Sequence, residues 1–206
     1  MFMGAGPEVH GYTEWGSRTP ELPSRVIVKN NIFPTIFQIY RDANPKAEIG
    51  VLSEWAGIQF LVDTLSTDYH AVAPDYNKFP TALCEMAEKY IKENKPSLVA
   101  ICFDNPDHVG HKEGHDTPAY YSKLEELDGY IARIVAAVKE AGMYDDTIFI
   151  ITSDHGGIKK RSWRKDNGRN ADTFYHRRKE HKKKPENFRK AWYNMMLLLP
   201  WHTFSD

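Results

Sequence analysis

Residues 97–111 read SLVAICFDNPDHVGH, an apolar run that passes directly into acidic and histidine residues. A continuous apolar run of this length is typical of a strand that is buried on both faces of a parallel sheet. Residues 147–157, TIFIITSDHGG, repeat the arrangement, because Asp154 and His155 follow a second apolar run. Open α/β sheets bind ligands at the carboxyl ends of their strands. The two segments therefore predict a functional site at one edge of such a sheet.

The residues around these two strands predict alternating helices and strands. Between them, six apolar residues keep the 3.6-residue period of a helix over residues 120–141, which Gly142 would end: Leu124, Leu127, Ile131, Ile134, Val135 and Val138. Weaker patterns predict helices after Pro34 and over residues 81–95, and a strand over residues 47–53. Residues 4–30 read as loop. The alternation indicates an α/β fold: a layered, mostly parallel sheet with helices on both faces and with strands 47–53, 97–103 and 147–152 as neighbours.

The bulk composition indicates a globular protein. The chain has 206 residues, of which 41% are hydrophobic and 27% are charged, which is enough for one domain with a core. Its two cysteines, Cys84 and Cys102, are expected to be buried free thiols. No apolar run approaches the ~18–20 residues of a membrane span, and no signal peptide is recognisable. As written, the chain is expected to stay in the cytoplasm.

Two carboxylate–imidazole pairs carry the chemistry of the predicted site. Asp107 and His111 follow the first strand, and Asp154 and His155 follow the second. Carboxylate oxygen together with imidazole nitrogen suits Zn²⁺ or a similar divalent ion. One such pair in a loop is usually a turn with a solvated histidine, but two pairs at two strand ends favour a metal site. His108 and His115 are interpreted as solvated loop residues, with a role facing the substrate as the alternative.

The order and spacing of these motifs resemble a known family. Pro106-Asp107-x-x-Gly110-His111-Lys112, a long helix containing Leu127-Asp128-Gly129, and then Ser153-Asp154-His155-Gly156 are similar to the type I phosphodiesterase / nucleotide pyrophosphatase family of the alkaline phosphatase superfamily. The resemblance covers about residues 1–158, which it identifies as part of a catalytic domain with an incomplete alkaline-phosphatase-like fold. It implies that Asp107 and His111 bind one ion and that Asp154 and His155 bind a second, with zinc expected at both.

The same resemblance implies an activity. The family hydrolyses phosphate esters or diesters, so a small phosphate ester or a nucleotide is the expected substrate, while the oligomeric state stays open. Relatives are often secreted or periplasmic. Sulfatases and metal-dependent phosphomutases of the superfamily are the alternatives, because they share the metal scaffold and differ in the nucleophile and the substrate pocket.

The resemblance also implies that parts of the catalytic centre are missing. The segment from Gly4 to Gly11 is similar to the family segment that follows the nucleophile, so the nucleophilic Ser or Thr is expected upstream of Met1. Thr13, Ser17 and Thr19 come after this segment and do not match. Each ion would also lack one family ligand, an upstream Asp or a downstream His. The chain is therefore expected to be a truncated fragment without substantial activity.

The C-terminal residues differ in charge from the rest of the chain. Residues 1–158 carry 13 Lys and Arg against 23 Asp and Glu, whereas residues 159–190 carry 14 against 4. One interpretation is a nucleic-acid-binding tail, in which aromatic residues such as Trp163 and Trp192 alternate with the basic ones. The favoured interpretation is a frameshift near residue 160. The codons of residues 161–165 can be chosen so that the neighbouring frame reads Gly-His-Gly-Gly-Lys, the motif expected there. Residues 159–206 would then be an out-of-frame tail that binds no nucleic acid. Because a shifted frame carries no selected hydrophobic period, residues 161–206 are expected to be poorly ordered or loosely attached.

Overall fold

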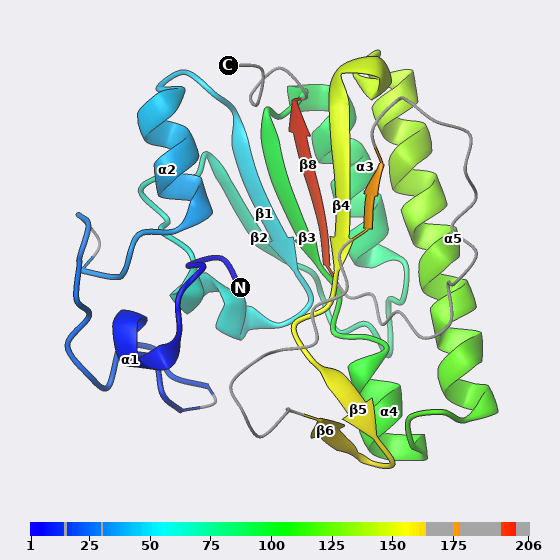
Figure 1. The fold of residues 1–206 in the computed structure, drawn as a ribbon. Helices are drawn as coiled ribbons and strands as arrows, with labels where there is room; N and C mark the ends of the chain where they lie inside the picture. The colour runs from blue at the N-terminus through cyan, green and yellow to red at the C-terminus, as the bar shows by residue number, and fades with distance from the viewer. Residues whose placement is uncertain (15, 30, 164–174, 178–194, 201–206) are drawn as a thin grey trace.

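The computed structural model describes residues 1–14, 16–29, 31–163, 175–177 and 195–200. Its centre is a six-stranded sheet in the order β2-β1-β3-β8-β4-β7 (Figure 1). β1 pairs in parallel with β2 and β3, whereas β8 pairs antiparallel with β3 and β4, and β7 pairs antiparallel with β4. Four of these described strands therefore run in one direction, which confirms the mostly parallel α/β sheet. Their bounds are β1 Ile49–Ser53, β2 Tyr69–Val72, β3 Leu98–Cys102, β4 Thr147–Thr152, β7 Tyr175–Arg177 and β8 Met195–Pro200.

The prediction that β3 and β4 are neighbours is wrong, because β8 lies between them. Residues 195–200, MMLLLP, pair with β3 on one side and with β4 on the other. Met196 and Leu198 pack into the core on one face of the sheet, and Leu197 packs into the core on the other. An apolar run suits a central strand that is covered on both faces. This run was expected to be loosely attached as part of an out-of-frame tail, and for these residues that expectation is wrong.

Helices cover both faces of the sheet, as predicted (Figure 1). On one face, Phe37 and Tyr40 of α2 (Ile36–Ala43) pack against residues of β1 and β3. On the other face, α3 (Ala82–Asn94) and α5 (Pro118–Glu140) contribute Leu83, Ile91, Leu127 and Ile134 to the second core cluster. Cys84 and Cys102 are both buried and free, which confirms the prediction for the thiols.

The ends of α5 follow from its local sequence. The Thr117 hydroxyl accepts a hydrogen bond from the Tyr120 backbone N–H, and Pro118 occupies the first turn, where it removes no intrahelical hydrogen bond. At the other end, Gly142 adopts a φ of 74° and its N–H reaches the Lys139 carbonyl. The helix predicted over residues 120–141 is thus confirmed to within a few residues at each end.

Shorter elements complete the described chain. Within residues 4–30, predicted as loop, the described positions contain a single helical turn, α1 (Pro7–His10). The 3-10 helices η1 (Ala56–Leu61) and η2 (Tyr144–Asp146) lie in connections. The helix α4 (Asp107–Glu113) follows β3, and the hairpin of β5 (Gly156–Ile158) and β6 (Arg161–Trp163) follows β4. Within the part that the structure describes, no helix has the length and apolar character needed to cross a bilayer.

Most of the basic tail lies outside the described residues. The nucleic-acid interpretation and most of the loosely attached segment fall on residues 164–174, 178–194 and 201–206. The division of the chain at residue 158 and the frameshift near residue 160 stay predictions. The DNA sequence around codon 160 would test the frameshift directly.

Candidate metal centre

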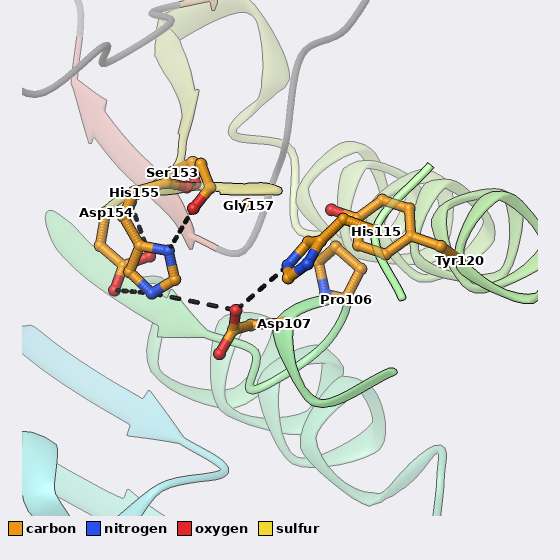
Figure 2. Close-up of a pocket in the computed structure, with 9 residues that line it drawn as sticks. Pro106, Asp107, His115, Tyr120, Ser153, Asp154, His155 and Gly157 are labelled. Carbon is orange, nitrogen blue, oxygen red and sulfur yellow. Dashed lines mark hydrogen bonds and ion pairs between the residues drawn. The ribbon is translucent and has the colours of Figure 1, made fainter. Parts of the chain in front are cut away.

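The two predicted ligand pairs meet at one edge of the sheet. Asp107 begins α4 just beyond the end of β3, and Asp154 and His155 follow the end of β4. Asp107 Oδ1 lies 4.0 Å from His155 Nε2, and Asp107 Oδ2 lies 3.2 Å from His111 Nε2. Asp154 Oδ2 lies 3.6 Å from His155 Nε2. The structure therefore brings the other three predicted residues close to Asp107. Figure 2 shows Asp107 facing His155, with Asp154 beside it.

Backbone carbonyl groups fix the orientation of three histidine rings at this edge. The Nδ1 atoms of His111, His115 and His155 lie 3.0, 2.8 and 2.9 Å from the carbonyl oxygens of Lys160, Lys159 and Gly156. Since a carbonyl only accepts, each Nδ1 carries a proton and donates it, which leaves Nε2 as the ring nitrogen that can bind a metal ion. All three Nε2 atoms face carboxylate oxygens. Metal-binding histidines typically hold their second nitrogen in this way.

The separations between these atoms suit a cation. A lone pair and a carboxylate oxygen repel each other unless a proton or a metal ion lies between them. Atoms bound to one tetrahedral zinc at ~2.0–2.1 Å lie about 3.3–3.5 Å apart, and the separations around Asp107 are between 3.2 and 4.0 Å. Asp107 Oδ1 is also buried without a hydrogen-bond partner among the described residues. These residues fit a divalent ion.

The carboxylate oxygens and imidazole nitrogens approach one another in pairs, without a set of three or more around one point among the described residues. Among the described residues, no group of three or more His, Cys, Asp or Glu side chains is arranged to hold an ion as it stands. Asp154 is exposed and His111 is nearly half exposed. The Lys160 carbonyl holds His111 and the His155 N–H holds Asp154, and both side chains remain accessible from solvent.

His115 differs from its prediction as a solvated loop residue. It is only 5% exposed, and its Nε2 lies 3.5 Å from Asp107 Oδ1. The chain returns to the site after α4 because Gly114 adopts a φ of 107°, a conformation that favours glycine. That glycine directly after the helix was the sequence signal for a reversal. His108 is exposed, as predicted, but it lies in α4 beside Tyr76 and not in a loop.

Several acidic groups surround the two pairs. Burial raises the pKa of the Asp104 carboxyl, and the negative charges of Asp107 and Asp154 raise it further. Burial and the charge of Asp154 raise the pKa of the Cys102 thiol to about 12. Burial likewise raises the pKa of Glu54 to about 7, although its Oε2 accepts the Asp104 N–H at 2.7 Å. The negative charges of Asp107 and Asp154, which raise the pKa values of their neighbours, attract cations.

Comparison with known proteins identifies the family. The sequence profile of the type I phosphodiesterase / nucleotide pyrophosphatase family matches residues 3–197. The chain belongs to this family. This is the family that the motifs around Asp107 and Asp154 indicate.

Relatives of this phosphodiesterase family member are much longer than the chain. It is 34% identical over 92 residues to alkaline phosphatase PhoD of Zymomonas mobilis, a match that covers 42% of this chain and 15% of that protein. It is 30% identical over 104 residues to a bis(5′-adenosyl)-triphosphatase of Mus musculus, covering 50% of this chain and 23% of the other. The chain thus spans less than a quarter of either relative.

One solved structure is also similar. Murine ectonucleotide pyrophosphatase / phosphodiesterase 5, an inactive variant in complex with AMP, matches with a TM-score of 0.43 and 21% identity. The match covers 61% of this chain and 33% of that one.

Proposed function

We propose that this chain carries the metal-binding part of a phosphodiesterase centre that hydrolyses phosphate esters or diesters, with a nucleotide or another small phosphate ester as substrate. The carrying observation is the Asp107 carboxylate, which faces the Nε2 atoms of His111, His115 and His155 at 3.2–4.0 Å. Family membership supplies the reaction class. The names of the relatives, among them a bis(5′-adenosyl)-triphosphatase, support a nucleotide-like substrate.

The proposed ligands are Asp107 and His111 for one divalent ion and Asp154 and His155 for a second, with zinc as the expected metal. Such ions, when bound, supply Lewis-acid stabilisation of the charge that develops on a phosphoryl group. The chain's own residues would bind these ions and fix the orientation of the ligand side chains. The carbonyl groups of Lys160 and Gly156 fix the rings of His111 and His155, and Asp107 is placed between the two strand ends.

Binding of metal and substrate is the decisive measurement, because no attacking hydroxyl is assigned among the described residues. Zinc content after dialysis and calorimetric titration would be compared for the natural chain, Asp107→Ala and Asp154→Ala. Glu125→Gln, at an exposed carboxylate on α5, is the matched control. We expect zinc binding by the natural chain and the control, and a loss of at least tenfold in affinity for both aspartate variants.

The phosphate ester is tested in the same titration. AMP and an aryl phosphate diester should bind to the zinc-loaded chain, and a chelator should abolish this binding. An aryl sulfate provides the comparison for the sulfatase alternative. Equal zinc affinity of all four proteins would contradict the proposal. AMP binding that persists in the presence of the chelator would also contradict it.

A further inference from the structure

His115 is the most enclosed histidine at the site, and the family motif does not assign it a role. Its ring packs against Tyr120 of α5, with ring centroids 5.3 Å apart. Gly110 of α4 and Gly157 of β5 press on the same ring, because a methyl group added to either glycine would overlap it. Two backbones and an aromatic ring therefore hold one imidazole in place.

One carbonyl group sets the direction of this imidazole. The Lys159 carbonyl oxygen accepts both the His115 backbone N–H at 2.6 Å and the ring Nδ1–H at 2.8 Å. The ring nitrogen that remains, Nε2, faces Asp107 Oδ1 at 3.5 Å (Figure 2). That oxygen is buried and accepts no hydrogen bond from the described residues. The arrangement presents one nitrogen lone pair and one carboxylate oxygen to a common point.

His111 presents its own nitrogen to the same carboxylate. Its Nε2 lies 3.2 Å from Asp107 Oδ2, and its ring stands edge-on to that of His115 with centroids 5.9 Å apart. Two imidazoles on one tetrahedral ion, with bonds of ~2.0–2.1 Å, have centroids about 5–6 Å apart. The two rings thus stand at the separation of ligands that share an ion.

We propose that His115 is a further metal ligand, whose Nε2 binds the same divalent ion as Asp107 and His111. The inference rests on the proposed function and deepens it. Two histidines and one carboxylate give that ion three protein ligands, the number found in catalytic zinc sites. The competing explanation is structural, namely a protonated His115 in an ion pair with Asp107 that never contacts metal.

Cobalt(II) substitution separates the two explanations without an activity assay. Each histidine bound to Co²⁺ through Nε2 gives one solvent-exchangeable Nδ1–H proton signal that the paramagnetic ion shifts far outside the normal range. We expect three such signals from the natural chain, from His111, His115 and His155. His115→Phe keeps a ring against Tyr120 but has no nitrogen, so two signals should remain. His108→Phe, at an exposed position of α4, should keep all three.

Zinc affinity and thermal stability complete the test. His115→Phe should lose more zinc affinity than the ~10–100-fold that an outer-shell partner costs, and most of the rise in Tm that zinc gives the natural chain. If His115→Phe fails to fold by circular dichroism, His115→Gln replaces it. Two signals in the natural chain, or the same number in the natural chain and the folded His115 variant, would overturn the role of His115. No shifted signal from any protein would instead overturn the proposed metal centre.

Discussion

Asp107 Oδ1 lies 4.0 Å from His155 Nε2 although the strands that precede these residues, β3 and β4, do not touch. With β8 between them, their axes are about 9–10 Å apart at the usual strand spacing. The connections beyond the strand ends close this gap, since α4 starts with Asp107 and the chain after β4 turns into the β5–β6 hairpin. The Lys159 and Lys160 carbonyl groups of that hairpin hold His115 and His111. The site is therefore a product of two connections that meet across a third strand.

The close approach of Gly157 to His115 predicts a sensitive position. Gly157→Ala would place a methyl group inside the His115 ring, so the ring or β5 must shift. We expect a lower Tm and a zinc affinity reduced by about tenfold or more, on the scale of a lost orienting partner. Gly129→Ala on α5 is the control, because nothing lies within 4 Å of an added methyl group there. It should gain up to ~1 kcal/mol in free energy of unfolding, since alanine favours helix interiors. Equal zinc affinity in both variants would argue against a role for the Gly157 contact in holding the His115 ring.

Glu54 predicts a pH-dependent loss of stability. Burial raises its folded-state pKa to about 7, above the ordinary value of 4.5. The folded state thus holds this proton more tightly than the unfolded state, and the natural chain loses stability as the pH rises from about 4.5 to about 7. Glu54→Gln removes this cost and keeps an oxygen for the Asp104 N–H. Relative to the natural chain, the free energy of unfolding of Glu54→Gln should rise by up to ~3 kcal/mol between about pH 4.5 and about pH 7. It should rise no further at higher pH.

Urea denaturation at pH 5 and pH 8 in the presence of a chelator measures this difference. Glu125→Gln, at an exposed carboxylate, is the matched control and should change little between the two values. If Glu54→Gln shows the same difference from the natural chain at both pH values, the raised pKa of Glu54 is wrong.

Two ion pairs between α3 and α5 predict different coupling energies. Arg133 Nε and Nη2 donate to Glu88 Oε1 and Oε2 at 2.7 and 2.9 Å, a two-point contact. Lys92 and Glu140 make a single contact at 2.6 Å, with side chains that are 44% and 62% exposed. Double-mutant cycles with alanine should give about 0.5–1 kcal/mol for the arginine pair, discounted for its partial exposure, and close to zero for the lysine pair. The reverse order would contradict the importance of two-point geometry.

The position of β8 predicts that a buried leucine there is essential to the core. Leu198 is 3% exposed and belongs to the cluster beneath α3 and α5. Leu198→Ala should lower the free energy of unfolding by about 2–5 kcal/mol. Leu22→Ala, at a leucine that is 50% exposed, should change it by less than about 0.5 kcal/mol. Equal effects in chemical denaturation would show that residues 195–200 do not form the centre of the sheet.

Local patterns in the sequence were sufficient for the elements that flank the site. The apolar runs of β3 and β4 and the 3.6-residue period of α5 predicted these elements to within a few residues, because burial on a sheet face or helix stripe repeats with a short period. The meeting of Asp107 with His155 was also predictable, since parallel strands end at the same edge. The family motif added the expected pairing of His111 with Asp107.

By itself, the sequence determined β1, β3 and β4, the long helix and the two carboxylate–imidazole pairs, because each depends on residues that are close along the chain. Only the tertiary structure decided that residues 195–200 enter the sheet, since pairing of distant strands depends on which edges and faces remain to be covered. It also decided that His115 is buried. The ring is placed by contacts with Gly157 and the Lys159 carbonyl, more than forty residues away in sequence. No local period records such a contact, because it depends on two connections folding against each other.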